Sequence, residues 1–338
     1  MIKLFSLSFI LFVAGLVHLI RPEVFLPAIP FFIEYPYEII YLTGILELLL
    51  AIGLIKKNTQ DIAARLTGFY FFLLLPIHIY VAFMNIEIFG IQSPTLLWGR
   101  TLFQFVFIFW ALSLQTKGWI IEQKWKNVFF IHYKIEPDLI SHLVPFKLDL
   151  HEGKAVISIV PFLMEGIRFP FLPSIPKVSK LWELNIRTYV EVNDVKGVYF
   201  FTLETDSKIG EMIARQFFHL PYRYSKIKAQ VTKEYYEFDH QRADYHFNLK
   251  AMILKRRRQN EFDHWTTERY SLFTKNGDKT YQGIVEHAPW QLRDVNLTQI
   301  GNNFTTMVTD QYLEFAGASF SRYRKVRFRP FKLIKEIA

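Results

Sequence analysis

The stretch Glu183-Leu-Asn185-Ile-Arg187-Thr-Tyr189-Val190 decides how the second half of this 338-residue chain is interpreted. Side chains of a β-strand alternate between two faces with a period of two residues. As a strand, the stretch therefore places a carboxylate, an amide and a guanidinium on one face, with apolar side chains on the other. Such a polar row predicts either a solvated surface or the wall of a binding cavity.

Composition divides the chain into an apolar first part and a basic second part. Hydrophobic residues make up 51% of the chain and charged residues 21%. Residues 1–117 hold seven Lys or Arg and six Asp or Glu, so the other 33 bases and 25 acids carry +8 of the net charge of +9. The chain has no cysteine, which excludes a disulfide framework, a thiolate metal site and a thiol nucleophile.

Four apolar stretches predict that residues 1–117 form an all-α bundle of four transmembrane helices. Each is about long enough to cross a hydrocarbon core of ~30 Å. A signal peptide is an alternative for the first stretch, but no small-residue cleavage site follows it. Buried helices of a soluble protein are another alternative. The stretches lie near 4–20, 38–55, 66–85 and 95–114.

The orientation of these spans follows from the bases in the short loops. Bases precede the first span, flank the loop between the second and third spans, and follow the fourth. We therefore predict a multi-pass protein of a bacterial inner membrane, with both termini and the large C-terminal part in the cytoplasm. The bases are Lys3, Lys56, Lys57, Arg65, Lys117, Lys124 and Lys126.

Polar side chains within the predicted spans are His18, Glu47, His78, Arg100 and Gln104. Ionisable groups in a membrane are costly and usually face the interior of a bundle. We expect Glu47 and Arg100 to neutralise each other. Two interpretations stay open: a polar core that fixes the helix register, and a small-molecule, quinone or proton site between the helices.

The order and spacing of motifs in about residues 1–115 resemble the DoxX-like family of four-helix membrane proteins. The resemblance implies a fold and a membrane location and little chemistry. We expect the lipid bilayer as a partner and the bundle as the contact surface of any homo-oligomer. The motifs are Gly15-Leu-Val-His18-Leu-Ile-Arg-Pro22, Phe25-Leu-Pro27-Ala-Ile-Pro30, Gly44-x-x-Glu47, Pro76-x-His78-Ile-Tyr80 and Trp98-x-Arg100-x-x-x-Gln104.

Short β-rich runs separated by Asn, Asp and Gly predict that residues 118–338 form a cytoplasmic α+β domain. Strands at this spacing favour an antiparallel barrel or sandwich. We expect Asp206 to cap a helix whose Ile209, Ile213 and Phe217 pack on the sheet. The predicted strands are 127–135, 154–163, 182–192, 197–205, 223–233, 244–254, 266–274 and 280–287.

Motifs in this second part resemble the YqjF-like domain of unknown function, over about residues 120–330. That family is similar to acetoacetate decarboxylase, which implies a mainly antiparallel β-cone enclosing a buried ligand cavity. The motifs include Phe130-Ile-His132-Tyr, Val160-Pro161-Phe162, Glu183-Leu-Asn185-Ile-Arg187-Thr-Tyr189, Gly197-Val-Tyr-Phe, Leu220-Pro221-Tyr222-Arg223, Thr267-Glu268-Arg269-Tyr270 and His287-x-Pro289-Trp290.

The resemblance places the decarboxylase's active-site residues on positions that differ from them. Its active-site glutamate falls on Glu183, its Schiff-base lysine on Tyr222, and the neighbouring lysine on Arg223. Its active-site arginine has no match, since Trp125 and Lys126 lie there. Imine chemistry requires an amine that can be deprotonated, which neither tyrosine nor arginine provides. We therefore do not expect the decarboxylase reaction in this chain.

We expect a cavity lined by Glu183, Asn185, Arg187, Arg215, Tyr222 and Arg223. Arginines in a dry cavity suit a carboxylate or phosphate ligand. Glu183 suits general acid–base catalysis if burial raises its pKa. The alternative is a structural ion pair of Glu183 and Arg187 with Arg215. We interpret Glu268-Arg269-Tyr270 and His287 as a cross-strand pair or rim contacts.

Other motifs exclude several functions. His240 and His246 lack a third partner at metal-ligand spacing, so we expect no metal. No glycine loop suits a phosphate or a dinucleotide, so we expect no cofactor. The basic clusters Lys255-Arg256-Arg257-Arg258 and Arg322 to Arg329 favour anionic lipid over nucleic acid, because the chain is already tethered to a membrane.

Two hypotheses follow. The first is a membrane-anchored protein that binds a small anionic metabolite, a carboxylate or a carbonyl compound, in the β-cone. The second is a membrane-anchored enzyme, lyase-like or hydrolase-like, that acts on a small keto or carboxylic acid with Glu183 as general acid or base.

Overall fold

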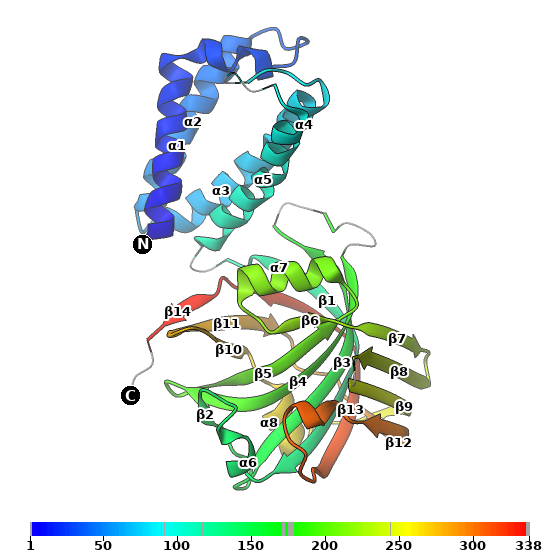
Figure 1. The fold of residues 1–338 in the computed structure, drawn as a ribbon. Coiled ribbons are helices and arrows are strands. Elements are labelled where there is room, and N and C mark those ends of the chain that lie inside the picture. The colour runs from blue at the N-terminus through cyan, green and yellow to red at the C-terminus, as the bar shows by residue number, and fades with distance from the viewer. Residues whose placement is uncertain are drawn as a thin grey trace. The chain divides into compact units, whose positions relative to one another are not determined.

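The computed structural model describes residues 2–88, 90, 92–115, 118–170, 173–174, 179–243 and 245–335. The chain forms two compact units, Met1–Ile120 and Ile121–Ala338 (Figure 1). The predicted boundary at 117/118 falls in the linker between the last helix of the first unit and the first strand of the second. Lys117, one of the predicted loop bases, lies outside the described residues.

The first unit is helical. Three of its helical segments are long and apolar enough to cross a membrane, judged by length and composition: Pro36–Ile55, Gln60–Phe83 and Pro94–Ser113. Leu4–Ile20 and Pro22–Ala28 make a fourth if this pair, bent by 101°, is one span. The helices are α1 (Ile2–Ile20), α2 (Pro36–Ile55), α3 (Gln60–Leu73), α4 (Leu75–Phe83) and α5 (Pro94–Ser113), with 3-10 turns η1 (Pro22–Val24) and η2 (Leu26–Ala28).

The third predicted span is two helices, because α3 ends at Leu73 and α4 begins at Leu75. Pro76 lies in the first turn of α4. A proline has no N–H and cannot continue the hydrogen-bond ladder of a preceding helix. The segment also begins earlier than expected, at Gln60.

Two glycines bring α1 and α2 into close contact. A Cβ atom added to Gly15 would lie 2.8 Å from the Gly44 carbonyl oxygen, and one added to Gly44 would lie 2.8 Å from the Cβ of His18. The Ser8 hydroxyl donates to the Ala51 carbonyl across the same interface at 2.7 Å. Small residues at this crossing therefore fix the helix pair.

Seven strands of the second unit close into a barrel in the order β11-β10-β5-β4-β3-β1-β13. Closure occurs where β11 pairs with β13, at Val285 opposite Phe328. All neighbours are antiparallel except β10 and β5, which are parallel. The strands are β1 (Ile121–Ile135), β3 (Ala155–Arg168), β4 (Lys180–Val192), β5 (Val195–Thr205), β10 (Ser271–Asn276), β11 (Lys279–His287) and β13 (Glu314–Phe328).

A second layer covers the outside of the barrel. Its strands follow β13 in the order β12-β9-β8-β7. Their aromatic and aliphatic side chains, such as Phe238 and Phe247, pack against Leu184 and Ile186 of β4 in one core cluster. The strands are β7 (Lys226–Val231), β8 (Tyr235–Arg242), β9 (Tyr245–Arg256) and β12 (Arg293–Asn302).

Shorter elements complete the second unit. β2 pairs with β4, β6 with β5, and β14 with β11. These elements are β2 (Lys147–Leu148), β6 (Tyr222–Tyr224), β14 (Lys332–Ile334), α6 (Asp138–Ser141), α7 (Lys208–Phe218), α8 (Glu261–Thr267) and η3 (Phe304–Met307). The prediction of a strand at 266–274 is wrong for residues 266–270, because α8 ends at Thr267 and β10 begins at Ser271.

The helix α7 also differs from the prediction in its cap and in the packing of Ile209 and Ile213, while the side chain of Phe217 lies outside what the structure describes. Ser207, and not Asp206, is the N-cap, and its side chain accepts a hydrogen bond from the Gly210 N–H. A Cβ on Gly210 would lie 3.0 Å from Leu181 of β4, so the glycine side of the helix faces the sheet. Ile209 and Ile213 are consequently exposed, with 53% and 39% of their surface accessible.

Candidate functional site

The barrel encloses a cavity. The space open to the centre of a water molecule is about 70 Å³, which suits on the order of five water molecules. Most of the wall is apolar, from Val128, Phe130, Val160, Phe162, Met164, Val198, Phe200, Leu203, Leu220, Leu272, Val285 and Phe328. The polar part of the wall consists of Gln123, Glu183, Asn185, Arg187, Tyr222, Thr267, Arg269, Ser271 and His287, with the indoles of Trp125 and Trp290.

The polar row of β4 faces this cavity. Glu183, Asn185 and Arg187 line it, whereas Leu184 and Ile186 lie in the core between the barrel and the outer sheet. The alternation of a strand thus separates a polar inner face from an apolar outer face. The row is a cavity wall and not a solvated surface.

Glu183 is almost fully buried, with 2% of its surface exposed. The Tyr222 hydroxyl donates a hydrogen bond to its Oε2, and the Asn185 Nδ2 donates to its Oε1 at 3.0 Å. Burial raises the pKa of Glu183 to about 7, because loss of hydration outweighs the two hydrogen bonds and the Arg187 charge. Burial and the Glu183 carboxylate raise the pKa of Tyr222 well above its ordinary value, so Tyr222 remains a donor.

Arg187 lies among aromatic rings, without a carboxylate partner among the described residues. Its guanidinium is 5.7 Å from the ring centre of Phe130 and 5.9 Å from that of Tyr189. One Nη donates to the Thr266 carbonyl at 3.4 Å. Its charge lowers the pKa of His287 in the same cavity, where burial is the larger cause.

Arg269 is a second cavity arginine, although its sequence motif predicts a cross-strand pair or a rim contact. It pairs with buried Asp149 at 2.6 Å, and its Nε donates to the Trp265 carbonyl at 2.6 Å. Its guanidinium is 5.1 Å from the ring centre of Tyr189. Arg187 and Arg269 therefore both contact this one ring.

Several buried polar atoms of the cavity residues have no hydrogen-bond partner among the described residues. Such atoms are rare in proteins and call for a bound water or ligand. They come from strands β1 and β4 and from the segment after α8. The atoms are Gln123 Oε1, Trp125 Nε1, Asn185 Oδ1, Arg187 Nε and Arg269 Nη2.

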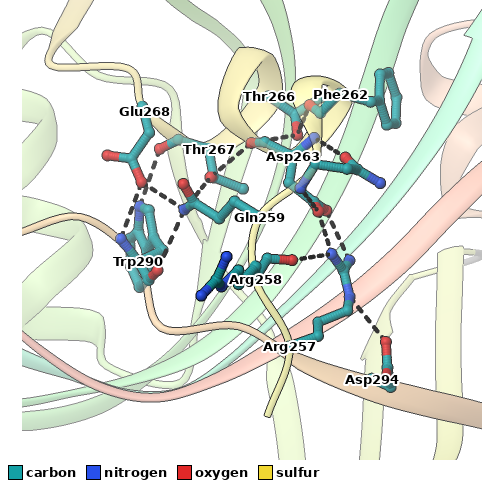
Figure 2. Close-up of polar contacts among 11 residues, drawn as sticks. Arg257, Arg258, Gln259, Phe262, Asp263, Thr266, Thr267, Glu268, Trp290 and Asp294 are labelled. Atoms are coloured by element: carbon teal, nitrogen blue, oxygen red, sulfur yellow. Dashed lines mark hydrogen bonds and ion pairs between the residues drawn. The ribbon is translucent and has the colours of Figure 1, made fainter.

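A capping box fixes the start of α8 (Figure 2). The Asn260 side chain accepts from the Asp263 N–H at 2.7 Å, and the Asp263 side chain accepts from the Asn260 N–H at 2.9 Å. Arg257 donates to the same Asp263 carboxylate and contacts Asp294 at 2.8 Å. These contacts hold the start of α8 in place.

The residues after α8 are joined to the cavity wall by a second set of hydrogen bonds, also drawn in Figure 2. The Glu268 carboxylate accepts from the Gln259 side chain at 2.6 Å and from the Trp290 N–H at 2.9 Å. The Trp290 indole N–H donates to the Thr267 carbonyl at 2.9 Å. These bonds position Thr267 and Trp290, which both line the cavity.

Two of the predicted cavity arginines lie elsewhere. Arg215 is on α7, where its exposed side chain pairs with Glu211 one turn away at 3.3 Å. Arg223 is exposed on β6, because it alternates with Tyr222 and so points away from the cavity. The proposed ion pair of Glu183 and Arg187 with Arg215 is therefore wrong.

No lysine is among the described residues that line the cavity, and Tyr222 contacts Glu183. The described residues also hold no group of three or more His, Cys, Asp or Glu that could bind a metal. The wall therefore offers arginines, amides, a carboxyl group, hydroxyls and an imidazole.

The polar residues of the helical unit form a different pairing from the expected one. Glu47 is buried and contacts His18 at 3.1 Å, and Tyr70 donates to it at 2.7 Å. Glu47 and Arg100 form no ion pair among the described residues, since His18 and Tyr70 occupy the carboxylate.

Gln104 and Thr101 of α5 donate hydrogen bonds to backbone carbonyls of neighbouring helices. The Gln104 amide donates to the Phe71 carbonyl at 2.9 Å, which joins α5 to α3. The Thr101 hydroxyl donates to the His78 carbonyl at 3.2 Å, which joins α5 to α4. These bonds fit the interpretation of a polar core that fixes helix register.

The closed barrel, its inner polar row and its cavity define a protein of acetoacetate decarboxylase-like fold. An acetoacetate decarboxylase-like enzyme from Sphingomonas wittichii RW1 aligns with a TM-score of 0.50 and 9% identity, covering 66% of this chain and 96% of that one. An acetoacetate decarboxylase from Legionella pneumophila aligns with a TM-score of 0.47 and 13% identity, covering 64% and 87%. At these identities the similarity concerns the fold alone.

The chain belongs to DUF2071, a family of uncharacterized conserved proteins, whose family model matches residues 122–316. Uncharacterized protein YqjF of Bacillus subtilis (strain 168) is 32% identical over 219 residues, which cover 61% of this chain and 90% of that protein. Residues 7–115 match a domain of unknown function, DUF8561. The YqjF-like resemblance is confirmed, and the DoxX-like resemblance stays a prediction.

Proposed function

We propose that this protein is anchored in a membrane by its helical unit and binds a small carboxylate inside its barrel. The observation that carries the binding proposal is Arg187, a partly buried cavity arginine that has no carboxylate ion-pair partner among the described residues. Arg187 and Arg269 contact one tyrosine ring, and Asp149 is the only carboxylate paired with either of them among the described residues. A buried charge requires a partner, and an anionic ligand supplies it.

The geometry of the guanidinium groups favours a carboxylate. An arginine presents several N–H groups in one plane and matches the two oxygens of a carboxylate. Arg187 Nε and Arg269 Nη2 both lack an acceptor among the described residues. The apolar remainder of the wall suits a short carbon skeleton, and the volume of about 70 Å³ suits a molecule of a few carbons.

The binding test compares two arginines of the second unit. Arg187→Gln removes a charge from the cavity, and Arg215→Gln removes one from the exposed face of α7. With the full chain in detergent, we expect acetate and propionate to raise the melting temperature of the parent and of Arg215→Gln, and to leave Arg187→Gln unchanged. Equal shifts in all three proteins contradict carboxylate binding in the cavity.

Imine chemistry is excluded from the proposal, because Tyr222 stands where a Schiff-base lysine is expected from the resemblance. Borohydride with pyruvate should therefore leave the parent unlabelled. Tyr222→Lys places an amine beside Glu183, and we expect it to gain one covalent adduct by mass spectrometry. Tyr224→Lys, on the exposed part of the same strand, is the control and should gain none. A labelled parent contradicts this part of the proposal.

An enzymatic role is the second candidate, and the pKa of Glu183 favours it. A carboxyl group with a pKa of about 7 suits proton transfer at neutral pH. Glu183 would take a proton from the carbon beside the ligand's carbonyl or carboxyl group. Exchange of that C–H for deuterium in D₂O, followed by NMR and lost in Glu183→Gln, would support an enzyme. Binding without exchange supports the binding protein.

Membrane attachment rests on the helices of suitable length and composition. The proposed orientation places both termini and the barrel in the cytoplasm, beside anionic lipid of the inner membrane. We also predict that any homo-oligomer forms through the helical unit, without assigning the residues that make the contact.

A further inference from the structure

Two kinds of hydrogen-bonding group in the cavity have no partner in the part of the chain that the structure describes. Three are donors: the N–H groups at Trp125 Nε1, Arg187 Nε and Arg269 Nη2. Two are acceptors: the amide oxygens of Gln123 and Asn185. All five residues line the same space. A ligand complementary to this wall must therefore both accept and donate hydrogen bonds.

The hydrogen bond to Glu183 fixes which way the Asn185 amide points. Its Nδ2 donates to Glu183 Oε1 at 3.0 Å, so the other end of the amide is the oxygen, which can only accept. Asn185 has 3% of its surface exposed, and bulk water does not reach it. Its oxygen needs a donor from within the cavity.

His287 adds a third acceptor. Its Nδ1 donates to the Ala288 carbonyl at 3.0 Å, because a carbonyl oxygen can only accept. In the neutral ring Nε2 then carries a lone pair, and His287 lines the cavity. Burial, with smaller effects of Arg324 and Arg187, lowers the pKa of His287 against the opposing effects of the Ala288 hydrogen bond and Glu268. The lowered pKa favours the neutral ring.

Common small acids differ in how they meet these requirements. A carboxylate and a keto group only accept, so a keto acid leaves the amide oxygens and the imidazole nitrogen unpaired. An ammonium group donates but adds a third cation beside Arg187 and Arg269. A hydroxyl group donates and accepts without a charge.

We propose that the cavity selects a small hydroxy acid, whose carboxylate binds the arginines and whose hydroxyl donates to one of the two amide oxygens and accepts from the Trp125 N–H. This inference rests on the proposed function, since it assumes that a carboxylate occupies the cavity, and it narrows the ligand class. A buried acceptor left unpaired weakens binding about tenfold or more. The preference for a hydroxyl over a keto group should therefore be at least about tenfold.

Three acids with one carbon skeleton test the proposal: lactate, pyruvate and alanine, which differ only in the group on carbon 2. A four-carbon pair, 3-hydroxybutyrate and acetoacetate, tests whether the preference depends on chain length. Binding to the full chain in detergent is measured by isothermal titration calorimetry at pH 7. We expect lactate to bind about tenfold or more tightly than pyruvate or alanine. If the cavity suits the longer chain better, we expect the same preference for 3-hydroxybutyrate over acetoacetate.

Matched variants identify the source of the preference. Gln123→Met and Asn185→Leu each remove a cavity acceptor, and the variant that removes the acceptor of the ligand's hydroxyl should reduce the ratio of hydroxy acid to keto acid affinity severalfold. Gln230→Met makes the same chemical change at an exposed position of β7 and should leave the ratio unchanged. A ratio that survives both cavity variants overturns the assignment to these amides.

The outcomes separate this inference from the proposed function. If pyruvate or alanine binds as tightly as lactate, and Arg187→Gln abolishes that binding, carboxylate binding stands and the hydroxy acid inference is wrong. If none of the five acids binds the parent, both are wrong. Hydroxy acid selectivity that disappears in Gln123→Met or Asn185→Leu supports the inference.

Discussion

Glu183 has surroundings that act on its charge in opposite directions. Tyr222 and Asn185 donate hydrogen bonds to it, and Arg187 contributes a positive charge, all of which favour the ionised form. Removal from water favours the neutral form and is the larger effect. The pKa of about 7 means that the carboxyl group is partly protonated at neutral pH, as a proton donor or acceptor must be.

The raised pKa of Glu183 predicts how stability depends on pH. The folded state keeps the proton up to about pH 7, while the unfolded chain loses it near pH 4.5. Protons therefore favour the folded state, and this group's contribution falls as pH rises from 4.5 to 7. The loss amounts to about 3 kcal/mol by that pH.

Glu183→Gln should remove this pH dependence. We expect the variant to gain stability relative to the parent between pH 5 and pH 8. The measurement is chemical unfolding of the full chain in detergent, followed by tryptophan fluorescence. Glu191→Gln, at the other end of β4 and paired with exposed Lys147, is the control. A constant difference between parent and Glu183→Gln from pH 5 to pH 8 would show that Glu183 has an ordinary pKa.

Four of the six side chains predicted for the cavity wall line it: Glu183, Asn185 and Arg187, predicted from strand periodicity, and Tyr222, predicted from the resemblance. Other wall residues were missed for a physical reason. The periodicity of a strand is a local property. The eight residues 183–190 are therefore enough to predict that Glu183, Asn185 and Arg187 lie on one face of the strand. Arg269 needs Asp149, which lies 120 positions away in the chain. A pattern in sequence contains no signal for such a pairing until the barrel is closed.

At the scale of elements, one carboxylate joins three strands of the barrel. Glu122 of β1 contacts Arg168 of β3 at 2.6 Å, and Lys325 and Arg327 of β13 at 2.9 and 2.8 Å. These cations hold the pKa of Glu122 at about 2, although burial opposes them. The ionised group therefore stabilises the folded barrel.

Glu122→Gln should destabilise the second unit at pH 7 by about 2 kcal/mol, after allowance for the partly exposed cations. The contribution is present above pH 4.5 and is lost as pH falls toward 2, so the difference between parent and variant should shrink over that range. Unfolding curves at pH 7, 4 and 3 measure it. A difference that grows with acidity would contradict the assignment.

Two helices of the barrel unit, α7 and α8, show where local rules compete. The spacing of Ile209 and Ile213 predicts an apolar face toward the sheet, but Gly210 allows a closer approach and that side of α7 packs instead. Residues 266 and 267 are β-favouring threonines, yet the capping box at Asn260 starts a helix that includes them. A propensity is a weak preference beside a hydrogen-bonded cap.

For the molecule as a whole, the membrane orientation is open to direct test because the chain has no cysteine. Phe32→Cys places a thiol between the first two predicted spans, and Lys57→Cys places one between the second and third. We expect a membrane-impermeant maleimide to label Phe32→Cys in intact spheroplasts. It should label Lys57→Cys, and Gln230→Cys on the barrel, only after lysis. The reverse pattern contradicts cytoplasmic termini.

The large-scale fold was predicted by resemblance more than by pattern. Alternation and turn residues indicated most strands before residue 287, but no strand was predicted beyond it. β12 and β13 lie there, and β13 closes the barrel against β1 and β11. Closure depends on which strands meet, and that depends on contacts between distant parts of the chain.

The pairing of Ile121 with Phe328 has a consequence for biosynthesis. A ribosome adds about 5–20 residues per second, so β1 waits roughly ten seconds or more for the strand that completes its hydrogen bonds. During that interval the first unit has already left the ribosome. The incomplete sheet has an unpaired edge strand, which can pair with other chains and cause aggregation. A nascent chain stalled before residue 314 should therefore be a client of chaperones, although its apolar helices are complete.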